Sequence, residues 1–292
     1  MTITHVLCPV DFSDFSRHAL AQAAALARWY GAKLTVLHIF VNRPSMDLPA
    51  FVLEDEDRDR LLADVRALAE AVHVTAPFVV RVEEAELAHE AILAEAKALG
   101  ADLLVLGSHG RSGFQQLFLG SVAEKVLRRA PCSTLVVPRR AVPVEAASEV
   151  RFKRILCPVD FSESSLDGVA TALGLALEAD AQLTLLHVVE MPPPMSGTAE
   201  DLIVVQFTAA LEKEAVKRLE ALIPDAARTY STVETAVVDG RAHREILRQA
   251  SERDSDLIVM GVRGRGAIDR LVFGATTHGV LHAARCPVLV VR

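Results

Sequence analysis

The sequence predicts an α/β protein of two tandem doubly wound domains, each a five-stranded parallel sheet flanked by helices. First, the heptapeptide LCPVDFS of residues 7–13 recurs at residues 156–162. Second, short β-branched runs alternate with longer helical stretches, as in a parallel sheet covered by helices on both faces. Third, the 292 residues of the chain suffice for two domains of roughly 100 to 200 residues each.

The repeat covers a whole domain. His38 and His187 keep the spacing of the heptapeptides, whereas Gly107 and Gly261 lie five residues further apart, so the second copy gains residues between these points. A repeat of about 140 residues exceeds the roughly 20 to 50 residues of a solenoid repeat. We therefore expect a first domain over residues 1–140, a linker over 141–150 and a second domain over 151–292.

The elements of the first copy follow from their composition and end signals. Ser13 or Asp14 can cap the N-terminus of the first helix, and Gly31 can cap its C-terminus. The fourth strand is apolar on both faces, which indicates a central position in a parallel sheet. The expected strands cover residues 4–10, 33–40, 78–82, 103–106 and 134–137, and the expected helices cover residues 13–30, 55–73, 88–99 and 121–129.

The composition excludes several classes of protein. With 51% hydrophobic and 24% charged residues the chain is globular, and its net charge of −7 argues against nucleic-acid binding. None of the four cysteines forms a C-x-x-C pair, so we expect small buried side chains and no zinc site. The start lacks a signal-like segment and no 18 apolar residues run together, so we expect a cytoplasmic protein without a membrane span.

A glycine-rich loop follows the fourth strand in both copies, with the same G-x2-G-x9-G spacing. Glycines let a backbone approach a ligand closely, and the last one precedes a predicted helix whose N–H groups favour an anion. One isolated loop would be interpreted as ordinary turns. The repeated spacing instead predicts a phosphate cradle, although it matches neither the Walker A nor the dinucleotide fingerprint. These glycines are Gly107, Gly110 and Gly120 in the first copy and Gly261, Gly264 and Gly274 in the second.

Two aspartates, Asp11 and Asp160, end the first strand of each copy. A carboxylate there can accept hydrogen bonds from a ribose hydroxyl or a base amino group. It can also cap the helix that follows, and both roles can hold together. Arg111 and Arg265 correspond in the glycine loops, where they either neutralise a phosphate or are exposed loop charges.

These motifs together resemble the universal stress protein family in its tandem form. The resemblance rests on the V-D-F-S opening, the glycine loop followed by Ser or Thr, and the closing P-C-x-x-L-V-V of residues 131–137, and it covers nearly the whole chain. It implies a Rossmann-like fold akin to the adenine nucleotide alpha hydrolases. It also implies ATP bound at the C-terminal ends of the first and fourth strands of each copy.

The resemblance assigns site residues position by position. In the first copy, Pro9, Val10, Asp11 and Ile39 would hold adenine and ribose, and Leu106, Gly107, Gly110, Gly120, Ser121 and Val122 would surround the phosphates. In the second copy the matching residues are Pro158, Val159, Asp160, Val188, Met260, Gly261, Gly264, Gly274, Ala275 and Thr276.

Each copy departs from the family pattern once. Ala275 replaces a Ser or Thr hydroxyl, which would weaken phosphate binding by about 1 kcal/mol. Glu86 stands where the second copy has Gly240. We therefore expect at least one of the two sites to bind nucleotide.

Several histidines are candidate ligands. His38 and His187 are expected at the edge of the core, and His109 either contacts a phosphate or is a loop residue exposed to solvent. His278 and His282 are spaced like metal ligands but lack a visible third partner, so no protein metal site is assigned. Any Mg²⁺ would arrive on the ATP phosphates.

The leading hypothesis is an ATP-binding stress-response sensor or regulator that changes shape or protein partner with occupancy. No general base or nucleophile recurs in both glycine loops, so no catalytic residue is assigned and any ATP hydrolysis would be slow. The alternatives are a slow ATP-hydrolysing enzyme and a scaffold that binds no nucleotide. By resemblance, the two halves would pair as an intrachain pseudo-dimer through residues 133–137 and 288–291, and pairing of two chains stays open.

Overall fold

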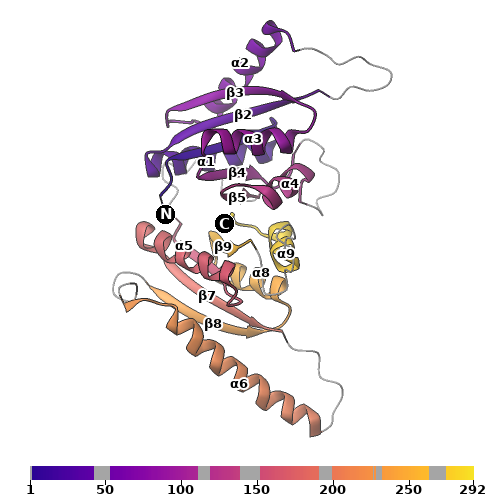
Figure 1. Ribbon diagram of the computed structural model, residues 1–292. Helices are drawn as coiled ribbons and strands as arrows, with labels where there is room; N and C mark the ends of the chain where they lie inside the picture. The colour runs from indigo at the N-terminus through magenta and orange to yellow at the C-terminus, as the bar shows by residue number, and fades with distance from the viewer. Residues whose placement is uncertain are drawn as a thin grey trace. The chain divides into compact units, whose positions relative to one another are not determined.

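The chain divides into two compact units, which are described separately (Figure 1). The first consists mainly of Thr2–Val150, and the second of Arg151–Ala284 and Val288–Arg292. A computed structural model describes residues 2–42, 53–110, 119–138, 152–190, 199–225, 227, 232–262 and 274–292, with only the backbone described for residues 199–208.

The first unit is a five-stranded parallel sheet in the order β3-β2-β1-β4-β5. Helix α1 packs on the central strands and touches α2, whereas α3 packs on β2 and β3 and against α4. The strand order reverses between β1 and β4, which makes this the switch point of a doubly wound sheet. The elements are β1 (His5–Val10), α1 (Asp14–Tyr30), β2 (Lys33–Val41), α2 (Asp55–Ala71), β3 (Phe78–Ala85), α3 (Ala88–Leu99), β4 (Leu103–Gly107), α4 (Ser121–Arg129) and β5 (Ser133–Val137).

The second unit repeats this architecture with the strand order β8-β7-β6-β9-β10, again parallel throughout. The predicted fold class of two doubly wound domains is thereby confirmed. The elements are β6 (Arg154–Pro158), α5 (Glu163–Ala179), β7 (Gln182–Val189), α6 (Ala199–Ala221), β8 (Val233–Asp239), α8 (Ala242–Glu252), β9 (Leu257–Gly261), α9 (Ala275–Ala283) and β10 (Val288–Val291).

The end signals of α1 act as predicted. The Ser13 side chain accepts a hydrogen bond from the Ser16 N–H, and Gly31 ends the helix with φ 62°. Two predicted boundaries are wrong by two residues or more. Strand β3 continues to Ala85 because it pairs with β2 from Leu34 to Val41, and α2 ends at Ala71, before His73 turns to φ 54°.

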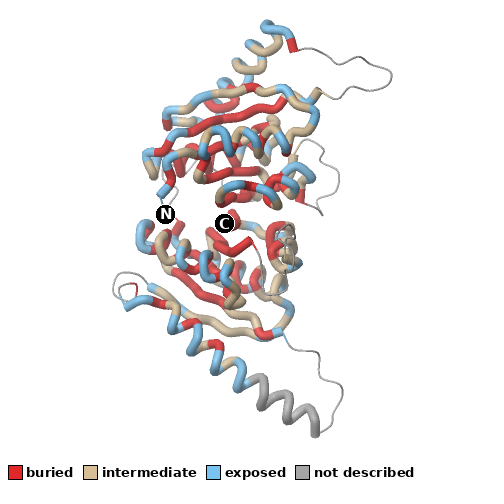
Figure 2. Tube along the Cα trace, viewed as in Figure 1, coloured by how far each residue is buried: buried red, intermediate tan, exposed pale blue. Residues whose placement is uncertain are grey.

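The central strands form the core of each unit (Figure 2). Leu104 and Val105 in β4 and Ile258 and Val259 in β9 have no exposed surface, as expected for strands covered on both faces.

All four cysteines have free thiols. Cys8 of β1 and Cys157 of β6 are fully buried, whereas Cys132 and Cys286 are half-buried. Burial raises the pKa of the Cys8 thiol, and it raises the pKa of Cys157 to about 12.

The strand registers locate the insertion between the two copies. Val41 pairs with Ala85, the last residue of β3. In the second unit the last pair is Val189 with Asp239, so the residue at the position of Ala85 is Gly240. Gly240 therefore matches Ala85, and Glu86 is one additional residue of the first unit rather than a replacement of the glycine. Gly240 adopts φ 139°, a conformation that favours glycine.

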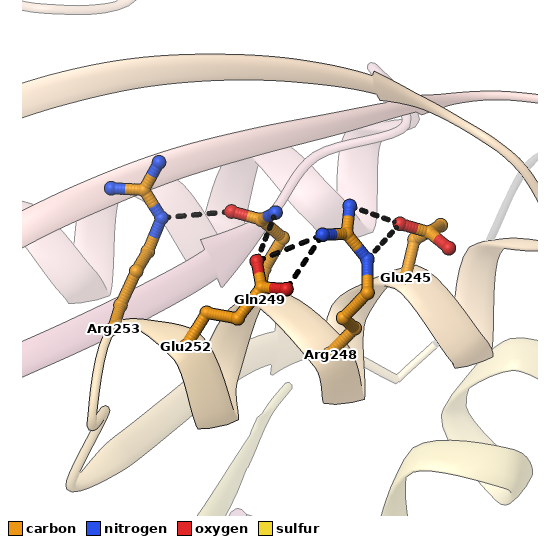
Figure 3. Close-up of polar contacts among 5 residues, drawn as sticks. All are labelled: Glu245, Arg248, Gln249, Glu252 and Arg253. Carbon is orange, nitrogen blue, oxygen red and sulfur yellow. Dashed lines mark hydrogen bonds and ion pairs between the residues drawn. The ribbon is translucent and has the colours of Figure 1, made fainter.

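Helix α8 carries a network of polar side chains (Figure 3). The Arg248 guanidinium donates to Glu245 at 2.7 Å and to Glu252 at 2.8 Å, and Arg253 donates to the side-chain oxygen of Gln249 at 2.9 Å. Exposed ion pairs stabilise a fold only slightly. We therefore regard the network as orienting Glu245, whose side chain covers Gly240.

Within the described residues, no helix is both long enough and apolar enough to cross a membrane.

Candidate functional site

The same hydrogen-bonded turn follows the first strand of each unit. In the first unit, Asp11 Oδ1 accepts hydrogen bonds from the Ser13 N–H (3.1 Å) and the Ser13 hydroxyl (2.6 Å). In the second, Asp160 Oδ1 accepts the same two bonds from Ser162, at 3.0 and 2.6 Å. The serine is thus the N-cap and the aspartate orients it, which supports the capping role and leaves a ligand role compatible with it.

An aromatic residue in an unusual conformation follows each aspartate. Phe12 and Phe161 have φ 65° and 62°, a region that L-residues other than glycine seldom occupy. Their rings lie 4.8 Å from the rings of His38 and His187, respectively. Such strained residues cluster at functional sites, although packing must hold them in place.

The two histidines have a structural role at this turn. His38 Nδ1 lies 2.8 Å from the carbonyl oxygen of Val10, and His187 Nδ1 lies 2.7 Å from that of Val159. Both lie within the second strand of their unit, at the core edge as expected, and each fixes the end of the first strand.

The glycine loop of the first unit meets the turn after β1. A Cβ atom on Gly110 would lie 2.6 Å from Asp11 Oδ2, and one on Gly107 would lie 2.9 Å from the backbone of Phe15. Gly110 is therefore needed where the two loops meet. Gly107 is needed so that α1 can pack directly on β4, which is a packing requirement and not evidence of a ligand.

His109 of this loop is half-buried rather than exposed to solvent. Its Nδ1 lies 3.0 Å from the Ser108 hydroxyl, and its ring lies 4.9 Å from that of Phe15. Its buried Nε2 has no hydrogen-bond partner among the described residues. A buried polar atom without a partner is costly, so this nitrogen is suited to a ligand or a water molecule.

Helices α4 and α9 begin directly after the last glycine of each loop. Gly120 and Gly274 are their N-caps, and neither helix has a side-chain capping bond. The first backbone bonds run from Glu124 N–H to Gly120 and from His278 N–H to Gly274. The preceding N–H groups, including that of Ala275, therefore have no intrahelical acceptor and can bind an anion.

The second unit contains a cavity of about 670 Å³ at the C-terminal ends of its strands. This volume lies within the roughly 300–1,000 Å³ typical of small-molecule sites. The wall comes from the ends of β6, β7 and β9 and from α6, α8 and α9. It includes every predicted site residue of this copy that the structure describes: Pro158, Val159, Asp160, Val188, Met260, Gly261, Gly274, Ala275 and Thr276.

Other predicted residues can be placed less fully. Pro9, Val10 and Ile39 lie at the ends of β1 and β2, Leu106 is buried in β4, and Ser121 and Val122 open α4. Arg111, Gly264 and Arg265 lie outside the described residues. Within the described part of the chain, no group of three His, Cys, Asp or Glu side chains could hold a metal ion.

Sequence reasoning missed several side chains of the cavity wall, among them Phe161, Glu190 and Arg218. Phe161 belongs to the repeated V-D-F-S motif, so the motif contained a signal for it. Arg218 lies in a helix of differing sequence, and nothing in the repeat pointed to it.

The model of the universal stress protein family matches residues 2–138 and again residues 151–292. The chain belongs to the universal stress protein family. It is a tandem member, and universal stress protein Rv2005c of Mycobacterium tuberculosis is 29% identical to it over 302 residues, covering 98% of this chain and 96% of the relative.

Solved structures agree on the fold. A universal stress protein from Archaeoglobus fulgidus, 21% identical, matches 100% of this chain and 99% of its own with a TM-score of 0.68. A universal stress protein in complex with cAMP, 25% identical, matches 48% of this chain and 99% of its own with a TM-score of 0.37.

Proposed function

We propose that this tandem universal stress protein binds ATP and acts as a stress-response regulator whose shape or protein partner depends on occupancy. The observation that carries the proposal is the cavity of the second unit, which gathers nine independently predicted residues into one wall. Sequence motifs alone identify these residues, so their convergence on one cavity supports a nucleotide site.

The cavity fits the parts of a nucleotide. Val159 and Val188 are apolar side chains suited to a base, and Asp160 lies beside them as a hydrogen-bond acceptor. The N-terminus of α9 at Ala275 supplies N–H groups and a positive dipole end for phosphates. In the first unit, the positions that match the base end are Val10, Ile39 and Asp11, and the position that matches the phosphate end is the N-terminus of α4 at Ser121.

A fast ATP-hydrolysing enzyme is the less favoured function. Of the ionisable side chains in the described cavity wall, Asp160 is bonded to Ser162, Glu190 accepts the Ala242 N–H at 2.7 Å, and Glu214 and Arg218 lie on α6. His187 is held by the Val159 carbonyl. These groups orient the site, and we assign none of them as a general base. Bound ATP would therefore persist, and the occupancy of the site would follow the ATP concentration. Mg²⁺ would be held by the phosphates.

The proposal is tested by unfolding freshly purified protein and identifying the released small molecule by chromatography and mass analysis. We expect one or two ATP molecules per chain. ADP or AMP would favour the hydrolase. No nucleotide, together with a blank calorimetric titration with Mg-ATP, would favour the scaffold and overturn the proposal.

Matched variants separate the two sites. Gly120→Arg should remove binding in the first unit, because its side chain would fill the space beside the backbone of residues 108–110. Gly274→Arg should do the same at the N-cap of α9. Each variant is expected to lower the ATP ratio of a doubly occupied protein by one, and unchanged ratios would contradict the assigned residues.

A further inference from the structure

Arg218 of α6 lies in the wall of the cavity, stacked on an aromatic ring. Its guanidinium carbon is 3.8 Å from the centroid of the Phe161 ring, and both residues line the cavity. Phe161 is itself fixed by its turn and by contact with His187 at 4.8 Å. Arg218 is exposed overall, and its guanidinium lies over the ring of a residue that belongs to the repeated turn.

The guanidinium is a cation among carboxylates, yet it has no ion pair with any described residue. The other charged side chains of the described cavity wall are Asp160, Glu190 and Glu214. Arginine carries five N–H donors and a flat face that stacks on planar groups. Its only described contact is with one ring, so the group remains able to contact a ligand.

The position of Arg218 identifies the part of the ligand that it would contact. Phe161 directly follows Asp160, at the end of the cavity where the proposed function places base and ribose. The phosphates would lie instead at the N-terminus of α9. A flat cation at the base end suits a purine ring, because guanidinium groups stack on nucleobases in many protein sites.

We propose that Arg218 is a nucleobase-binding residue of the second unit, which stacks on the purine ring of the bound nucleotide. This inference rests on the proposed function of the same cavity. It also makes the two sites unequal, because Phe12 of the first unit, with the same turn and the same histidine contact, has no cation over its ring among the described residues.

The test measures binding at the second site alone. In nucleotide-free Gly120→Arg protein, ATP and adenosine are titrated calorimetrically before and after the change Arg218→Met. Methionine keeps an unbranched apolar chain but removes the charge and the flat face. We expect affinity for both ligands to fall by about tenfold, which corresponds to 1.4 kcal/mol.

Two controls keep the result specific. Lys217→Met removes the same charge from the neighbouring exposed position of α6, outside the cavity wall, and should leave both affinities unchanged. Arg218→Lys keeps the charge without the flat face, so it should recover little of the loss. Thermal melting of each variant checks the fold.

The outcomes separate this inference from the function on which it rests. Unchanged affinities in Arg218→Met would overturn it, as would a loss for ATP but not adenosine, which would indicate a phosphate contact. Full recovery by Arg218→Lys would also overturn it, because charge alone would then suffice. If the Gly120→Arg protein binds neither ligand while Gly274→Arg binds ATP, the second site fails and the inference falls with it.

Discussion

The two units share the turn after the first strand but differ in what surrounds it. The Ser hydroxyl donates to the Asp carboxylate at 2.6 Å in both, and the following Phe adopts nearly the same φ. By contrast, the first residue of α4 is Ser121, whereas the first residue of α9 is Ala275. In addition, an arginine lies over the ring of Phe161, whereas no cation lies over the ring of Phe12 among the described residues. After duplication the backbone frame of the site persisted, while the side chains that would discriminate between ligands changed.

A second comparison lies at the opposite end of the sheets. Asp102 accepts hydrogen bonds from the Thr4 N–H (2.7 Å) and hydroxyl (2.6 Å), and the hydroxyl bond is the main reason that the pKa of Asp102 is lowered. Asp256 accepts the Lys153 N–H at 2.7 Å but lacks the hydroxyl donor. Burial therefore dominates and raises the pKa of Asp256.

The largest expected effect comes from the glycine at the end of the fourth strand. A Cβ on Gly261 would overlap the Ser164 backbone, whereas one on Gly107 would lie 2.9 Å from the Phe15 backbone. We expect Gly261→Ala to lower the free energy of unfolding by about 3 kcal/mol, and Gly107→Ala by about half as much. Urea unfolding followed by far-ultraviolet circular dichroism measures both.

The single tryptophan, Trp29, lies in α1 and identifies which unit is affected. Its fluorescence transition should move in Gly107→Ala and stay in place in Gly261→Ala. Equal destabilisation by the two substitutions would show that the tighter contact in the second unit relaxes freely.

An intermediate effect is expected from the paired aspartates. Asp102→Asn should cost about 2 kcal/mol of stability at pH 7, and Asp256→Asn at most about 1 kcal/mol. Because its folded pKa is lowered, Asp102 contributes stability that is complete above its ordinary value of 3.8 and is lost as pH falls through the folded value. The contribution of Asp256 to stability depends on pH in the opposite direction. Because its folded pKa is raised, this contribution is present below pH 3.8 and disappears as pH rises through the folded pKa.

Urea unfolding at pH 7 and at about pH 3, which is below the ordinary value of 3.8, measures these differences. The cost of Asp102→Asn should shrink at the lower pH. An Asp102→Asn cost that is the same at both pH values, or a cost of Asp256→Asn at pH 7 that equals or exceeds that of Asp102→Asn, would contradict the predicted difference between the two carboxylates.

The smallest expected effect concerns the first residue of α4 and α9. Ala275→Ser should tighten ATP binding at the second site by about fivefold, because it restores a hydroxyl beside the phosphate position, and Ser121→Ala should weaken the first site by a similar factor. Titrations in the Gly120→Arg and Gly274→Arg backgrounds measure each site by itself. If neither substitution changes the affinity, the backbone N–H groups alone would bind the phosphates.

The repeat made most of the fold predictable. Caps such as Ser13 and Gly31 and the doubly apolar fourth strand depend on neighbouring residues, so local chemistry specifies them. The length of β3 was not predictable, because its last residues, including Glu83 and Glu84, are polar and extend only through pairing with β2. Glu86 was misplaced for the same reason, since only strand register shows which residue is additional.

The site was predictable where motif and geometry coincide. Asp160 and Gly274 belong to motifs that occur in both copies of the repeat. Arg218 lies 58 positions after Asp160 in the chain, and it reaches the cavity from a helix that has no such motif. Whether such a side chain stacks on Phe161 depends on how α6 packs, which no local pattern specifies. The packing role of Gly107 was likewise hidden, because the same glycine suits a phosphate cradle equally well.

One cysteine is buried in the first strand of each unit, so the reactivity of its thiol can report when that strand becomes exposed to solvent. A thiol-specific reagent should modify the half-buried Cys132 and Cys286 first, because thiols such as Cys157, with a pKa near 12, must be uncovered before they form a thiolate. Mass-resolved labelling of Cys8 and Cys157 would then time the opening of each sheet separately, without an added probe.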